Sequence, residues 1–99
     1  MPLLETIRAK AGATLLDIVR PGWADQVSPE RLDLSDCQAC VLGQLYGNYT
    51  EGVEKLFAMA ENGTRYTVAD RAGFDVVPGT TYSTLTKAWR REIEKRRNA

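Results

Sequence analysis

The clearest pattern along the chain is an apolar stripe near its beginning. Apolar residues recur there at intervals of three, four, four and three positions: Leu4, Ile7, Ala11, Leu15 and Ile18. Residues at this spacing lie on one face of an α-helix. The pattern predicts a helix over about residues 3–20 that buries this face. Pro21-Gly22 should end it, and the large ring of Trp23 should pack across the helix end.

A second stripe lies near the other end of the chain. Its apolar residues follow at intervals of three, four and four positions: Tyr82, Leu85, Trp89 and Ile93. This spacing predicts a helix that begins at Thr80 or Thr81 and points these side chains inward.

The middle of the chain predicts shorter helices. Ser35-Asp36-Cys37-Gln38 has the pattern of a capping box and predicts a helix that begins there and ends at Gly47. Thr50 is a candidate cap for the next helix, which Asn62-Gly63 should end. Thr67-Val68-Ala69-Asp70 is a second capping box and predicts a helix of one or two turns.

The fold class that follows is mainly α. Only residues 65–67 and 75–77 could form a minor short strand pair, so we expect one compact helical domain, residues 1–99, with four to five helices. Gly43 lies inside a predicted helix, where glycine costs about 1 kcal/mol relative to alanine, and this predicts the close approach of another helix. One core is expected from these side chains: Leu4, Ile7, Leu15, Ile18, Val41, Leu45, Leu56, Phe57, Leu85, Trp89 and Ile93.

Composition excludes several kinds of chemistry. The chain has no histidine, which removes the commonest general base, the histidine-dependent nucleophile pairs and most zinc sites. The carboxylates are scattered singly along the sequence, and no glycine-rich phosphate loop or nucleophile motif is present. We therefore expect a protein that is not an enzyme and needs no cofactor.

The net charge of zero conceals an uneven distribution. Residues 85–99 hold six basic side chains against two acidic ones, so the rest of the chain is acidic. Such a basic end can bind phosphates or an acidic partner, although cations at the end of a helix also complement the helix dipole. The candidate partner-binding side chains of this region are Lys87, Arg90, Arg91 and Lys95.

Part of the sequence is similar to a helix-turn-helix DNA-binding motif. Residues 68–74, followed by Thr80-Thr81-Tyr82, have its small-residue helix, glycine turn and second helix. Two features oppose this interpretation. The connection is longer than the usual turn of about three to four residues, and Glu92 and Glu94 should pair with Arg96 and Arg97. DNA binding by the C-terminal helix is therefore the alternative function.

Cys37-Gln38-Ala39-Cys40 is the sharpest chemical feature of the chain. Two thiols at the start of a helix could serve redox chemistry or bind a metal. A closed zinc site needs four ligands, and this chain offers two cysteines and no histidine, so only a site shared by two copies would be complete. We therefore expect Cys37 and Cys40 to be buried structural thiols, weak candidates for metal binding.

Two tyrosines are further candidates for partner binding. Tyr46 and Tyr49 flank Gly47-Asn48 and could form an exposed aromatic loop, since tyrosine offers a large contact area with a polar end. The alternative is that Tyr46 closes the core and Tyr49 packs over it.

The sequence also resembles one group of proteins. The matching segments are residues 20–23, 32–47, 72–75 and 85–90, and the most specific is the run Cys-x-x-Cys-Val-Leu-Gly-Gln-Leu-Tyr-Gly within 37–47. They resemble small proteins of unknown function encoded by actinobacteriophages and their hosts. The resemblance implies a phage-type protein inside a bacterial cell and supplies no catalytic residue.

An intracellular accessory protein is the expectation that follows. No secretion signal and no apolar run of membrane-spanning length occurs in the sequence. We expect it to act in the cytoplasm by binding another macromolecule, in the first place a host or phage protein, and not to associate with a membrane.

Overall fold

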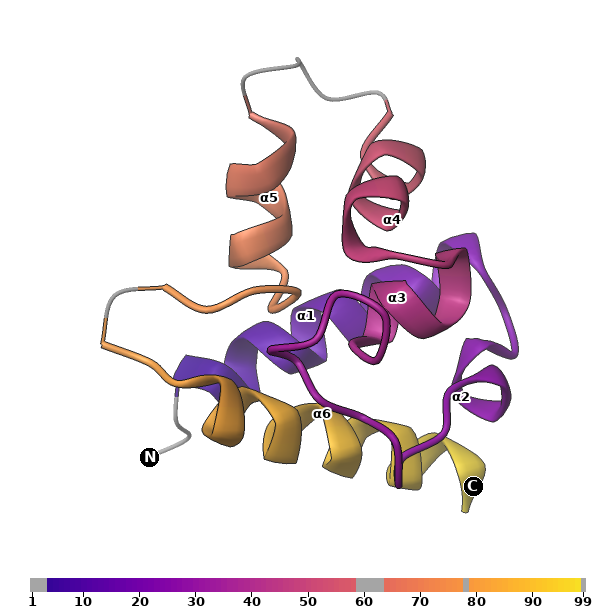
Figure 1. The fold of residues 1–99 in the computed structure, drawn as a ribbon. Coiled ribbons are helices and arrows are strands. Elements are labelled where there is room, and N and C mark those ends of the chain that lie inside the picture. The colour runs from indigo at the N-terminus through magenta and orange to yellow at the C-terminus, as the bar shows by residue number, and fades with distance from the viewer. Residues whose placement is uncertain (1–3, 59–63, 78, 99) are drawn as a thin grey trace.

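The computed structural model describes residues 4–58, 64–77 and 79–98. These residues form six helices and no strand (Figure 1). The helices are α1 (Leu4–Val19), α2 (Trp23–Gln26), α3 (Val41–Tyr46), α4 (Tyr49–Leu56), α5 (Arg65–Arg71) and α6 (Tyr82–Arg97). The predicted mainly-α fold is confirmed. The structure has one helix more than the four to five expected, and this helix, α2, is a single turn. The candidate strand at residues 65–67 is the beginning of α5.

The two long helices, α1 and α6, form the base of the fold. They pack against each other along their lengths, and α2 packs against the C-terminal half of α6 (Figure 1). Helices α4 and α5 pack together and rise from the other side of α1. The radius of gyration is 12.2 Å, close to the roughly 13 Å expected for a domain of this length.

Helix α1 turns a different face inward from the one that the apolar stripe predicts. Its buried residues are Glu5, Ala9, Gly12, Ala13 and Leu16. Of the predicted core residues, Leu4, Ile7 and Ile18 are exposed, so their placement was wrong. The reason is that α6 presents large side chains to α1. The narrow glycine and alanine face of α1 leaves room for them and lets the two helices approach more closely than its leucine and isoleucine face would.

Helix α6 has the inward face that its stripe predicts. Leu85, Trp89 and Ile93 are buried, whereas Tyr82, the first residue of the stripe, is exposed. Thr81 begins the helix as its N-cap, and its side chain accepts a hydrogen bond from the backbone N–H of Thr84.

An aromatic cluster centred on Trp89 fills the core. Its ring centroid lies 5.2 Å from Phe74 and 5.8 Å from Trp23, and the indole N–H donates to the carbonyl oxygen of Gly73. Trp23 packs at the end of α1, as predicted, and its N–H donates to Asp17. The other predicted core residues are buried or partly buried: Leu15, Val41, Leu45, Leu56 and Phe57.

The capping box at Ser35 does not begin a helix. Asp36 accepts hydrogen bonds from the backbone N–H groups of Gln38 and Ala39 and closes a turn, and α3 begins at Val41. The turn folds back against α3, where a Cβ at Gly43 would stand 2.4 Å from the carbonyl oxygen of Cys37. The close approach predicted at Gly43 therefore comes from the preceding turn and not from another helix.

Two other helices begin earlier than the sequence predicts. Asn48, and not Thr50, caps α4, where its side chain accepts from the N–H of Glu51 at 2.8 Å. Helix α4 ends at Leu56, and the predicted end at residues 62–63 lies outside the described residues. Helix α5 begins at Arg65, ahead of the second capping box.

Candidate functional site

A loop segment lies along one side of α6 and forms a groove with it. We refer to residues 27–34 as the strap. Three hydrogen bonds tie the strap to α6: Arg97 to the carbonyl of Val27 (3.4 Å), Arg90 to the carbonyl of Pro29 (3.2 Å), and the N–H of Leu34 to the hydroxyl of Thr86 (3.0 Å). The strap thus runs antiparallel to α6 and is held at three levels of the helix.

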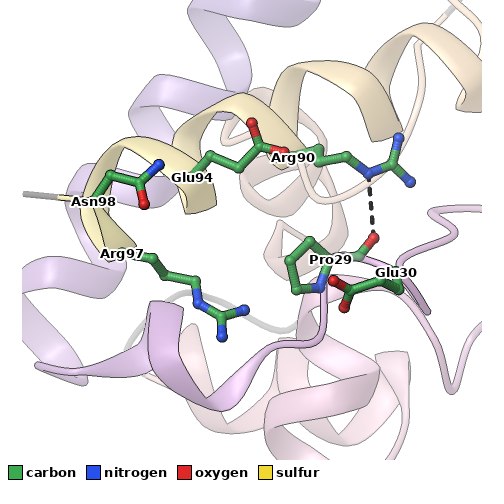
Figure 2. Close-up of a pocket in the computed structure, with 6 residues that line it drawn as sticks. All are labelled: Pro29, Glu30, Arg90, Glu94, Arg97 and Asn98. Atoms are coloured by element: carbon green, nitrogen blue, oxygen red, sulfur yellow. Dashed lines mark hydrogen bonds between the residues drawn. The ribbon is translucent and has the colours of Figure 1, made fainter.

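Two adjoining cavities open between the strap and α6. The first, of about 410 Å³, is lined by Pro29, Glu30, Arg90, Glu94, Arg97 and Asn98 (Figure 2). The second, of about 580 Å³, shares Glu30 and Arg90 with the first and extends to Tyr82 at the beginning of α6. We refer to the two cavities together as the α6 groove.

The α6 groove carries charges of both signs. Its basic side chains are Arg31, Lys87, Arg90 and Arg97, and its acidic side chains are Glu30, Asp33 and Glu94. Hydrogen bonds from its own backbone N–H and from the Ser28 hydroxyl lower the pKa of Glu30. The side chain and backbone N–H of Ser35 lower the pKa of Asp33 in the same way. Both carboxylates are therefore ionised at neutral pH.

The structure separates the four basic residues that the sequence groups together. Lys87 and Arg90 line the α6 groove, and in Figure 2 Arg90 reaches across to Pro29. Arg91 and Lys95 are exposed outside it, and the Lys95 ammonium lies 3.2 Å from a carboxylate oxygen of Glu92.

An ion-pair cluster neutralises much of the remaining positive charge on α6. Glu92 is only 3% exposed, and Arg96 donates to it at 2.9 Å, which confirms one of the two predicted pairs. The predicted pair of Glu94 with Arg97 was wrong, because Arg97 donates to the carbonyl of Val27 instead. The Arg96 guanidinium also makes two bonds of 2.9 Å to Asp17 of α1. This contact lowers the pKa of Asp17 and raises the pKa of Arg96. Arg96 is thus committed to joining α6 to α1.

The two candidate tyrosines do not form one exposed aromatic loop. Tyr46 ends α3 and is partly buried, with the Arg20 guanidinium 4.8 Å from its ring centroid. Tyr49 begins α4, and burial raises the pKa of its hydroxyl. That hydroxyl is inaccessible and has no hydrogen-bond partner among the described residues. The interpretation in which these rings pack on the core fits better than an exposed loop.

The two cysteines differ in accessibility, so the prediction that both are buried holds only for one. Cys40 is 2% exposed and caps α3, where its sulfur accepts from the N–H of Gly43 at 3.2 Å. Cys37 is exposed, and both thiols are free. Burial raises the pKa of the Cys40 thiol. Within the described residues, no group of three or more potential metal ligands occurs.

The arrangement of α5 and α6 differs from that of a helix-turn-helix motif. Residues 72–81 separate the two helices, and α5 packs against α4, whereas α6 packs against α1 and α2. A short turn does not present α6 as a recognition helix. Its distinctive feature is the groove that it forms with the strap. The sequence identified Lys87 and Arg90 as candidate binding residues, but it did not identify Arg31, Arg97 and Tyr82 as such. Only the position of the strap brings these side chains together in one groove.

Comparison of the chain with protein-family profiles, with curated proteins and with solved structures finds no match. The resemblance to actinobacteriophage proteins therefore stays a prediction. None of the helices in the described part of the chain combines the length and apolar character needed to cross a membrane.

Proposed function

We propose that this protein acts by binding another protein, and that the α6 groove is the binding surface. The observation that carries this proposal is the mixed charge of the groove, which is lined by cations and carboxylates from both α6 and the strap. A polypeptide segment with both basic and acidic side chains complements such a surface, and charge complementarity of this kind favours specific association between proteins. The role is one of binding and not of catalysis.

The same observation disfavours the alternative, a DNA-binding regulator that uses α6. A phosphate backbone that approached Lys87 and Arg90 would also meet Glu30 and Glu94, which repel it. Arg96 is already engaged by two carboxylates. A dedicated DNA-binding surface instead presents a continuous patch of lysine and arginine.

The proposed partner is a host or phage protein, met inside a bacterial cell. The resemblance stated above supports this setting.

Affinity capture with paired charge-reversal variants tests the proposal. Wild-type protein, the groove variant Arg31→Glu/Lys87→Glu and the control Lys10→Glu/Lys55→Glu are each used to retain proteins from a nuclease-treated actinobacterial lysate. The two variants change the net charge equally, and the control residues are exposed outside the groove. We expect one protein that wild type and control retain and that the groove variant does not. Equal retention by all three would contradict the proposed surface.

Binding to duplex DNA tests the alternative directly. Four phosphate contacts would give a slope of log affinity against log salt of about −3.6. We expect only weak, sequence-independent binding at low salt. Submicromolar binding to one duplex sequence at physiological salt, lost in Arg90→Ala/Arg91→Ala, would establish the DNA-binding function instead.

A further inference from the structure

The outer face of α1 carries an apolar stripe that the rest of the described structure leaves largely uncovered. The stripe consists of Leu4, Ile7, Ala11, Leu15 and Ile18; Leu15 is half-buried against the core and the other four are exposed. Leu4 is 48% exposed, Ile7 53% and Ile18 74%. On the opposite side of the helix, small residues such as Ala9 and Gly12 face the core. Exposed apolar residues aligned in this way typically mark a contact with another protein.

The stripe is distinct from the other surfaces of the molecule. None of its five residues lines the α6 groove. None of them is charged, and the nearby Asp17 is held by Arg96 of α6. A partner for this stripe must therefore itself present an uncharged apolar face.

The stripe has a symmetry that identifies such a partner. Its intervals of three, four, four and three residues are the same in both directions along the helix, with Ala11 at the centre and two large side chains on either side. When two copies of α1 run antiparallel, Leu4 of each lies opposite Ile18 of the other, Ile7 lies opposite Leu15, and the two Ala11 residues meet. We infer that a second copy of this chain covers this face, with its α1 antiparallel to the first.

Two physical arguments support a second copy over an unrelated protein. A two-fold symmetric interface uses the same patch on both subunits, so the patch must complement itself. The intervals of the stripe, which are the same in both directions, meet this condition. An interface with an unrelated protein would not require it. The smallest side chain of the stripe, Ala11, also lies on the proposed two-fold axis, where the helices must approach most closely.

The area of the face determines how strong this pairing is. A helix of 16 residues is about 24 Å long, and half of its roughly 10 Å wide cylinder presents roughly 400 Å². A stable interface buries about 800 Å² on each partner. The pairing is therefore weak and reversible, and it becomes populated only at high protein concentration.

Sedimentation equilibrium from micromolar to millimolar protein measures the pairing. We expect the apparent mass of the wild type to rise towards twice that of the chain. Ile7→Glu and Ile18→Glu should each abolish this rise, because both place a charge in the paired face, while circular dichroism shows that they remain folded. Lys10→Glu changes an exposed residue of α1 outside the stripe and should dimerise like the wild type.

Cysteine cross-linking tests the antiparallel register. In a Cys37→Ser background, which removes the exposed native thiol, Ala11→Cys places two thiols at the two-fold axis, and Lys10→Cys places them outside the contact. A disulfide needs Cβ atoms about 4 Å apart. We expect mild oxidation to produce a covalent dimer of Ala11→Cys much faster than of Lys10→Cys.

Three outcomes would overturn the inference. They are a wild-type protein that stays monomeric at millimolar concentration, a dimer that persists in Ile18→Glu, and equal cross-linking of the two cysteine variants. None of these outcomes bears on the α6 groove, so the proposed function is tested separately.

Discussion

Gly12 of α1 lies directly against the indole of Trp89 of α6. A Cβ at position 12 would stand 2.7 Å from Cζ2 of the ring and 2.1 Å from the carbonyl oxygen of Ala72. Both distances are shorter than van der Waals contact permits, so only glycine fits. This contact sets how closely the two long helices approach, and it explains why α1 faces the core with its small residues.

Gly12→Ala should therefore destabilise the protein. Alanine is favoured over glycine by about 1 kcal/mol within an exposed helix, but overpacking typically costs about 1 to 3 kcal/mol. Because the added Cβ would clash with a backbone oxygen that cannot easily move, we expect a net loss of up to about 2 kcal/mol. Urea unfolding monitored by circular dichroism measures the difference. Thr14→Ala, at an exposed position of the same helix, should unfold at a urea concentration close to that of the wild type. A Gly12→Ala protein more stable than the wild type would refute this contact.

Truncation of Trp89 should cost more. Trp89→Ala removes the ring that contacts Trp23 and Phe74, and the expected loss is about 3 to 5 kcal/mol, enough to threaten a domain of this size. Trp89→Phe keeps an aromatic ring but removes the N–H that donates to Gly73, so its loss should be smaller. Thermal melts of both variants check this order, and a melting curve of Trp89→Ala that matches the wild type would show that α6 is misplaced.

The contact between Arg96 and Asp17 should make stability depend on pH in the acid range. Because the hydrogen bonds from Arg96 lower the pKa of Asp17 in the folded state, its carboxylate stabilises the fold at pH values above its unfolded pKa of about 3.9. This contribution is lost as the pH falls through the folded-state pKa. Asp17→Asn should therefore be less stable than the wild type at neutral pH, and the difference should shrink on acidification.

A double-mutant cycle separates this ion pair from other effects of the Asp17 substitution. In an Arg96→Met background, Asp17→Asn should change the free energy of unfolding much less than it does in the wild type. An equal effect in both backgrounds, measured by urea unfolding at pH 7, would mean that Asp17 acts through another contact, such as its bond from Trp23.

The two cysteines should react at different rates. Cys37 is exposed and should react rapidly with a thiol reagent in the native protein, whereas Cys40 should react only after unfolding, because it is buried and its pKa is raised. Counting modified thiols with and without denaturant measures this. Rapid modification of both thiols in the native protein would contradict the burial of Cys40.

The same two residues provide a test for metal binding. We expect purified protein to hold no stoichiometric zinc, since a single chain offers two thiols and no histidine. Elemental analysis checks this. One zinc per two chains, removed by a chelator together with dimerisation, would establish a site of four thiolates shared between two copies.

Local pattern was sufficient for α6 and for the helical class of the fold. The spacing of Leu85, Trp89 and Ile93 identified the buried face correctly, because nearly every other residue of this helix is polar and only one side could enter the core. The Glu92–Arg96 pair was predictable for a similar reason, since residues four apart on a helix are neighbours whatever surrounds them.

The local sequence pattern gave the wrong prediction where a segment had two possible buried faces or two possible helix caps. Helix α1 has an apolar face of large residues and a second face of small ones, and spacing alone favoured the first. Ser35 and Asp36 could both cap a helix, but their hydrogen bonds close turns, and the sulfur of Cys40 caps α3 instead. In each case the choice depended on what the rest of the chain packs against the segment.

The sequence by itself determined that this protein is helical, which face of α6 is buried, and that histidine-dependent chemistry is absent, because these properties depend on composition or on neighbours within one helix. Only the tertiary structure decided which face of α1 enters the core, since that choice depends on the fit of the Trp89 ring against Gly12. It also decided that Arg90 and Lys87 share a groove with acidic side chains of the strap. These residues are far apart in the chain, and only the packing of the strap on α6 brings their charges together.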